Sequence, residues 1–70
     1  MKTTIEKLEK TRKSLSNYVA RGGRNTSQRG YDLIDRYNDL RDMAIRDGLW
    51  KDYCDEHNFS IFHDAIDFFA

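Results

Sequence analysis

Four aspartates with 3-4-3 spacing form the clearest candidate site in the sequence: Asp32, Asp35, Asp39 and Asp42. On an α-helix this spacing places the four carboxylates on one side, spread over about 15 Å at roughly 1.5 Å per residue. A rigid row of carboxylates can imitate the phosphates of a nucleic acid and bind the basic groove of a nucleic-acid-binding protein. The alternative is an ordinary solvated helix face. It is favoured by two potential ion pairs between residues four apart, Asp32 with Arg36 and Asp42 with Arg46.

The helix that would carry this row is predicted from Ser27 to Asp47. Apolar residues recur on its opposite side with 4-3-4 spacing: Leu33, Tyr37, Leu40 and Ala44. Ser27 or Thr26 can cap the start of the helix, and Gly48 ends it. One side of the helix should therefore be buried and the other exposed. Gly30 lowers the stability of its first turn, which a close approach of another helix or a frayed end would explain.

Residue types that bind metals occur together in the last third of the chain: Cys54, His57, His63 and Asp64. Cys54 and His57 have the spacing of half a zinc site, but a second half of the Cys-x2-Cys or His-x3-His type is missing. Cys54 also falls on the apolar side of a predicted helix, where a thiol is usually a small buried hydrophobe. A glycine-rich phosphate loop is missing too, because Arg21-Gly22-Gly23 lacks the Lys-Ser/Thr ending. We therefore expect no metal, no cofactor and no catalytic centre.

The net charge of the chain is zero, but its two halves carry opposite charges. Residues 1–30 contain eight Lys/Arg and two Glu, a net charge of +6, and residues 31–70 contain four Lys/Arg and ten Asp/Glu, a net charge of −6. The basic half suggests an alternative function, nucleic-acid binding, in which Arg21, Arg24 and Arg29 contact phosphates. Against this alternative, the lysines of the first helix point in several directions and alternate with glutamates. A further alternative is that the two halves neutralise each other.

A first helix is predicted from Thr4 to Ala20. Thr3 and Glu6 have the spacing of a capping box, and Gly22-Gly23 ends the helix. Apolar residues follow a heptad pattern along it: Ile5, Leu8, Leu15 and Val19. Arg12 breaks this pattern. Its charge is expected in water at the edge of the interface, beside a carboxylate of the second helix or the C-terminal segment, or against a second copy of the chain.

Two short helices are predicted after Gly48, from Leu49 to Glu56 and from Ile61 to Phe69. Leu49, Trp50, Tyr53 and Cys54 line one side of the first. Ser60 is a plausible N-cap of the second, which has Phe62, Ala65, Ile66 and Phe69 on one side. These two helices contain more aromatic residues than they can bury against the rest of the chain. We expect Phe68 and Phe69 to be the exposed remainder and to contact a partner together with the aspartate row.

These patterns predict an all-α protein in which an antiparallel helical hairpin is closed by two short C-terminal helices, as one domain over residues 1–70. A single cysteine favours a reducing cytoplasm, and no apolar run has the length of a membrane span. We expect a non-enzymatic regulator or inhibitor that binds a protein, of the kind that phages and mobile elements encode to block a host nucleic-acid-binding protein. We also expect self-association as a possible source of stability for so small a chain.

Overall fold

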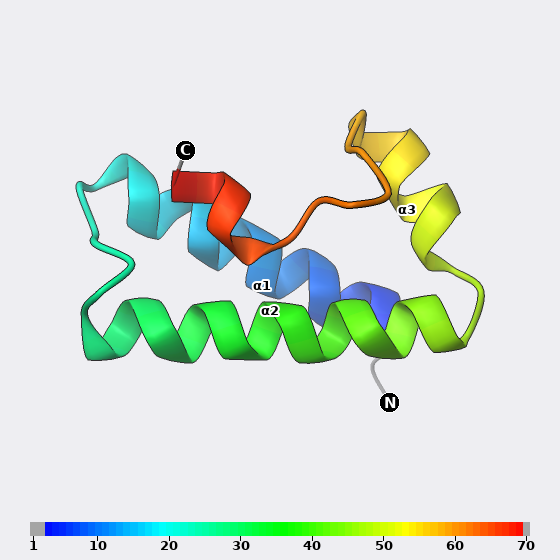
Figure 1. Ribbon diagram of the computed structural model, residues 1–70, viewed down its shortest axis with the longest axis horizontal. Coiled ribbons are helices and arrows are strands. Elements are labelled where there is room, and N and C mark those ends of the chain that lie inside the picture. Colours follow the sequence, from blue (N-terminus) through cyan, green and yellow to red (C-terminus); the bar gives the residue numbers. More distant parts are fainter. Residues whose placement is uncertain (1–2, 70) are drawn as a thin grey trace.

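The computed structural model describes residues 3–69 and contains three α-helices followed by a short 3₁₀-helix. The helices are α1 (Thr4–Ala20), α2 (Gln28–Arg46), α3 (Trp50–His57) and the 3₁₀-helix η1 (Ala65–Phe69). No strand occurs between residues 3 and 69, so the predicted all-α class is confirmed. Lys2, which belongs to the basic first half of the chain, lies outside the described residues. In Figure 1, α1 runs obliquely behind α2 in the opposite direction, and η1 packs on both of them.

The sequence signals locate α1 correctly at both ends. Thr3 Oγ1 accepts a hydrogen bond from the Glu6 amide at 3.1 Å, and the chain leaves the helix through Gly22 with φ +81°. The buried side of α1 consists of Leu8, Thr11 and Leu15. Thr11 therefore takes the core position that the heptad pattern gave to Arg12. Its hydroxyl donates to the carbonyl oxygen of Lys7 at 2.9 Å, which satisfies the buried polar group.

α2 is the element against which the other helices pack. Its buried side includes every apolar residue of the 4-3-4 pattern and also Ile34, which the pattern did not include. Tyr37 is fully buried at the centre of the core, where its ring meets Trp50 and Phe68 edge-on at centroid distances of 6.5 and 5.3 Å. Because its apolar side is covered in this way, the remaining side of α2 faces solvent.

Gly30 permits a close approach of the preceding loop to α2, not of another helix. A Cβ atom at Gly30 would lie 2.3 Å from the carbonyl oxygen of Arg24. The same carbonyl oxygen lies within hydrogen-bonding distance of the hydroxyls of Tyr18, at 3.0 Å, and Ser27, at 3.1 Å. Ser27 Oγ in turn accepts a hydrogen bond from the Gly30 amide at 3.1 Å, as the N-cap of α2. The loop is therefore fastened to the ends of both long helices.

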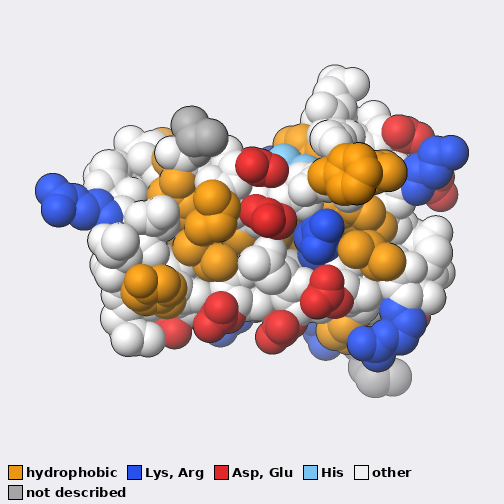
Figure 2. All heavy atoms as spheres, in the orientation of Figure 1, with side chains coloured by type: hydrophobic (Ala, Val, Ile, Leu, Met, Phe, Trp, Pro, Cys, Tyr) orange, Lys and Arg blue, Asp and Glu red, His pale blue; other side chains and the backbone are white. Residues whose placement is uncertain are grey.

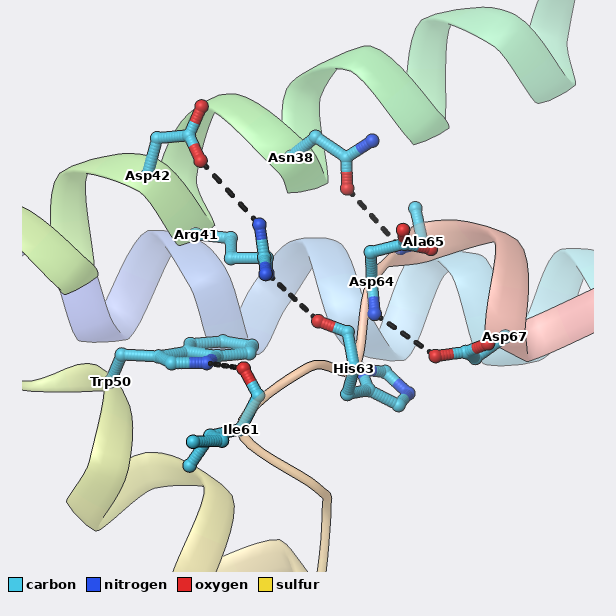
Figure 3. Close-up of polar contacts among 9 residues, drawn as sticks. All are labelled: Asn38, Arg41, Asp42, Trp50, Ile61, His63, Asp64, Ala65 and Asp67. Atoms are coloured by element: carbon cyan, nitrogen blue, oxygen red, sulfur yellow. Dashed lines mark hydrogen bonds and ion pairs between the residues drawn. The ribbon is translucent and has the colours of Figure 1, made fainter.

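The predicted helix from Ile61 to Phe69 is wrong over its first half. Ser60 Oγ accepts a hydrogen bond from the Phe62 amide at 3.2 Å, but only turns follow, and η1 begins at Ala65. An α-helix would join the Ala65 amide to the Ile61 carbonyl. Here Trp50 Nε1 donates to that carbonyl at 2.8 Å, and the Ala65 amide donates to Asn38 Oδ1 at 3.2 Å (Figure 3). Side chains of α2 and α3 thus take the backbone groups that a helix would need.

Candidate functional site

The four aspartates of the predicted row all lie on the exposed side of α2. Neither predicted ion pair, Asp32 with Arg36 or Asp42 with Arg46, forms among the residues that the structure describes. Asp32 Oδ1 accepts a hydrogen bond from Gln28 Nε2 at 3.0 Å. Asp42 Oδ1 lies 3.6 Å from Arg41 Nη1, a loose contact at the surface. All four carboxylates are therefore exposed, and among the described residues only Asp42 lies within ion-pair distance of a cation.

The C-terminal segment adds two carboxylates to this side of the molecule. The hydrogen bond between the Ala65 amide and Asn38 Oδ1, at 3.2 Å, holds the start of η1 against α2 (Figure 3). Asp64 is half-buried and Asp67 is exposed. Each also bonds a backbone amide nearby: Asp64 Oδ1 accepts from Ile66 at 2.9 Å, and Asp67 Oδ2 accepts from Asp64 at 3.1 Å. Figure 2 shows carboxylates both along α2 and above it, where this segment packs.

We call these six residues the acidic face: Asp32, Asp35, Asp39, Asp42, Asp64 and Asp67. Sequence reasoning found the four on α2 because helical periodicity relates them. It missed Asp64 and Asp67, since no periodicity relates η1 to α2 and their placement depends on the contact with Asn38.

Arg41 lies at the edge of the acidic face and is fixed there by contacts with the C-terminal segment and with Trp50. Its Nε donates to the His63 carbonyl at 2.8 Å, and its guanidinium carbon lies 5.4 Å from the centre of the Trp50 ring. The side chain therefore holds the C-terminal segment in place, while its Nη1 lies 3.6 Å from Asp42 Oδ1 at the end of the row (Figure 3). Its charge offsets part of the charge of Asp42 alone.

Phe68 and Phe69 are half-buried and pack against the core. Phe68 meets Tyr37 and Phe69 meets Tyr18, at centroid distances of 5.3 and 6.3 Å. The most exposed aromatic side chain between residues 3 and 69 is instead Phe62, which the sequence pattern placed on one side of a helix with Ala65, Ile66 and Phe69. A partner-binding role for Phe68 and Phe69 stays a prediction.

Basic side chains gather in two depressions along the seam between α1 and α2. The larger, of about 580 Å³, is lined by Lys7, Lys10, Arg36 and Asp39, with Leu33 and Leu40 among its other residues. The smaller, of about 250 Å³, is lined by Ser14, Asn17, Tyr18, Arg21 and Arg29. Ser14 lines both, so the two depressions adjoin. The structure thus brings Arg21 and Arg29 together in the smaller depression, whose lining does not include Arg24, and places Lys7, Lys10 and Arg36 in the larger one beside it.

The predicted metal-ligand types do not converge. Within residues 3–69, no three side chains of His, Cys, Asp or Glu are grouped to hold a metal ion. Cys54 is fully buried, and this burial raises the pKa of its thiol above the usual range. His63 stacks face to face on Phe59 at 4.1 Å, and its partial burial lowers the pKa of the imidazole. These residues serve the packing of the core.

Arg12 pairs with a carboxylate of its own helix, which differs from all three expectations for it. Its Nε donates to Glu9 Oε1 at 2.8 Å, and His57 Nε2 of α3 lies 2.9 Å from Glu9 Oε2, a contact without hydrogen-bond geometry. Partial burial raises the pKa of Glu9, but the hydrogen bond and charge of Arg12, together with His57, outweigh it and leave the pKa below its ordinary value. This cluster joins α1 to α3.

None of the helices in residues 3–69 combines the length and the apolar composition needed to cross a membrane. Comparisons of the chain with protein-family models, with curated proteins and with solved structures found no match.

Proposed function

We propose that this protein is a non-enzymatic regulator or inhibitor that binds a partner protein through its acidic face. The partner carries a basic groove of the kind that accommodates nucleic acid, and the bound chain blocks that groove. The observation that carries the proposal is the exposure of all four α2 aspartates, of which only Asp42 lies within ion-pair distance of a cation among the described residues, at 3.6 Å from Arg41.

The density of charge along α2 supports this choice of partner. One carboxylate every three or four residues corresponds to about 5 Å of helix axis. One strand of duplex DNA presents a phosphate every 3.4 Å or so along its axis. The acidic face is thus a somewhat sparser line of negative charge, widened by Asp64 and Asp67. Lysines and arginines that contact successive phosphates of a nucleic acid can also contact this row of carboxylates. The negative electrostatic field of the row accelerates association with such a basic partner.

The rigidity of the face supports the proposal further. Its α2 residues lie on a helix whose other side is buried, and η1 is fastened to that helix by Asn38 and Arg41. A partner therefore does not have to order these carboxylates on binding, which lowers the entropic cost of association.

The experiment is an affinity capture from the native cell with two matched variants. Asp35→Lys with Asp42→Lys reverses two charges on the acidic face, and Asp55→Lys with Glu56→Lys makes the same change of charge at exposed positions of α3. We expect basic nucleic-acid-binding proteins to be retained by the wild type and the α3 variant, and lost from the α2 variant. If the α2 variant and the α3 variant retain the same proteins in equal amounts, the acidic face is not the binding surface.

A second candidate function, nucleic-acid binding, is favoured by the clustering of Arg21 and Arg29 beside the groove of Lys7, Lys10 and Arg36. It predicts a gel shift that weakens with salt, with a slope that becomes shallower by about two when two phosphate contacts are removed. Arg21→Ala with Arg29→Ala should show this change. Arg24→Ala with Arg46→Ala loses the same charge outside the groove and serves as the control. No shift of any oligonucleotide at low salt excludes this candidate.

A further inference from the structure

The most exposed large hydrophobic side chain among residues 3–69 is Phe62, at 80%. Ile61 beside it is 52% exposed, and Ile45 on α2 is 46% exposed. The backbone on both sides of Phe62 is held firmly, because Trp50 Nε1 donates to the Ile61 carbonyl and Arg41 Nε donates to the His63 carbonyl, each at 2.8 Å. The exposed ring is therefore carried by an anchored loop. Figure 3 shows the hydrogen bonds that hold the carbonyls of Ile61 and His63 on either side of it.

A recess of about 650 Å³ lies directly beside the Phe62 ring. It is lined by Ile45, Gly48, Trp50, Lys51, Ile61, Arg41 and Phe62 itself. Trp50, which is nearly buried, lies under the loop that carries Phe62 and contributes to the apolar lining. The same small surface thus presents both a protruding aromatic ring and an apolar hollow.

We propose that this surface, formed by Ile45, Trp50, Ile61 and Phe62, is the interface of a two-fold symmetric homodimer in which Phe62 of each copy enters the recess of the other. A two-fold interface must be complementary to itself, and a surface with a knob beside a hollow meets that requirement. The charges agree with a second copy as well. Arg41 and Lys51 line the recess and the Asp42 carboxylate lies 3.6 Å from Arg41, so that both signs are available to pair across the axis.

Phe62 contributes more exposed apolar area to this surface than any other residue in it. Phe62 alone exposes about 160 Å², if a fully exposed aromatic side chain presents roughly 200 Å². A stable interface buries about 800 Å² on each partner, so one ring supplies about a fifth of it, and the exposed parts of Ile45, Ile61 and the recess lining add to this area. Aromatic anchors that enter preformed pockets dominate the energetics of such interfaces. None of the four residues that form this surface belongs to the acidic face, which it adjoins at Arg41 and Asp42.

The test is sedimentation equilibrium of the full chain over a concentration series. We expect the wild type to approach twice the 8.3 kDa of one chain. Phe62→Ala should weaken the dimer at least about 30-fold, the loss typical of a hot-spot residue, and Phe62→Asp should be monomeric. Tyr31→Asp also replaces an exposed aromatic residue by aspartate, but on α2 and outside the proposed interface, so this variant should still form the dimer. Circular dichroism checks the fold of each variant, which replacement of so exposed a ring should preserve.

Three outcomes would overturn the proposal. The first is a wild-type chain that stays monomeric throughout the series. This outcome overturns the proposal even if Phe62 then proves to bind a different protein. The second is a Phe62→Asp variant that dimerises as tightly as the wild type. The third is dissociation by Tyr31→Asp to the same degree, which would place the interface elsewhere.

Discussion

Replacement of Gly30 by alanine separates what helix propensity predicts from what the structure predicts. Gly30 lies in the first turn of α2, and alanine is favoured over glycine in a helix by about 0.8–1.0 kcal/mol. Propensity alone therefore predicts that Gly30→Ala stabilises the protein. In the structure the added Cβ would lie 2.3 Å from the Arg24 carbonyl oxygen and 3.2 Å from Asn25 Cα, and both are backbone atoms.

The steric cost exceeds the gain in propensity. Moving the Arg24 oxygen out to an ordinary contact needs a displacement of about 1 Å, and overpacking of this kind typically costs 1–3 kcal/mol. The displacement also disturbs the contacts of that oxygen with the Tyr18 and Ser27 hydroxyls, each worth about 1 kcal/mol. We expect a net loss of about 2 kcal/mol in the free energy of unfolding. For a domain of this size the melting temperature then falls by roughly 10 °C.

Thermal and urea unfolding, followed by circular dichroism, measure this change. Gly22→Ala provides a contrasting glycine, because nothing lies within 4 Å of a Cβ there and only its φ of +81° resists the change. That variant should lose about 1 kcal/mol from the left-handed conformation alone. A Gly30→Ala variant that is as stable as the wild type, or more stable, refutes the reasoning about the loop contact.

Three further predictions concern the core. Trp50→Phe removes the indole donor to the Ile61 carbonyl and should lower the free energy of unfolding by about 1–2 kcal/mol in urea titrations, whereas an unchanged midpoint would contradict this. Burial lowers the pKa of His63 below 6.5, so its contribution to stability is present above pH 6.5 and is lost as the pH falls below it. His63→Phe should therefore make the free energy of unfolding less dependent on pH in this range. The same pH dependence in the variant and the wild type would contradict this prediction. Cys54 is buried and burial raises its pKa, so a thiol reagent should modify the native chain far more slowly than the urea-unfolded chain, and equal rates would disprove its burial.

Local signals sufficed for α1 and α2 because their ends and sides depend on residues within a few positions. Thr3 and Ser27 cap the two helices as their spacing predicts, and both ends of α1 and the span of α2 follow from the glycines and the apolar periodicity. The exposure of the α2 aspartates follows from the same periodicity. The part of the candidate site that lies within one helix was therefore predictable from the sequence.

The errors lie where contacts between distant residues override local preference. Residues 61–64 have a helical apolar pattern. However, Trp50 and Arg41 donate hydrogen bonds to the carbonyls of Ile61 and His63, and Asn38 accepts one from the Ala65 amide. Asp64 also accepts a local hydrogen bond from the Ile66 amide. The exposure of Phe62 and the addition of Asp64 and Asp67 to the acidic face both follow from this rearrangement. The contacts made by Trp50, Arg41 and Asn38 join residues that are 11 to 27 positions apart, and they have no signature in the local spacing of the sequence.

The most direct test of the central claim, that the acidic face is the partner-binding surface, is the affinity of the purified chain for its captured partner, measured at several salt concentrations. We expect binding of the wild type to weaken as salt rises, and Asp35→Lys with Asp42→Lys to bind about 100-fold more weakly, since like charges would then oppose each other across the interface. Asp55→Lys with Glu56→Lys should bind like the wild type. An affinity that is insensitive to salt and the same in both variants would contradict the account.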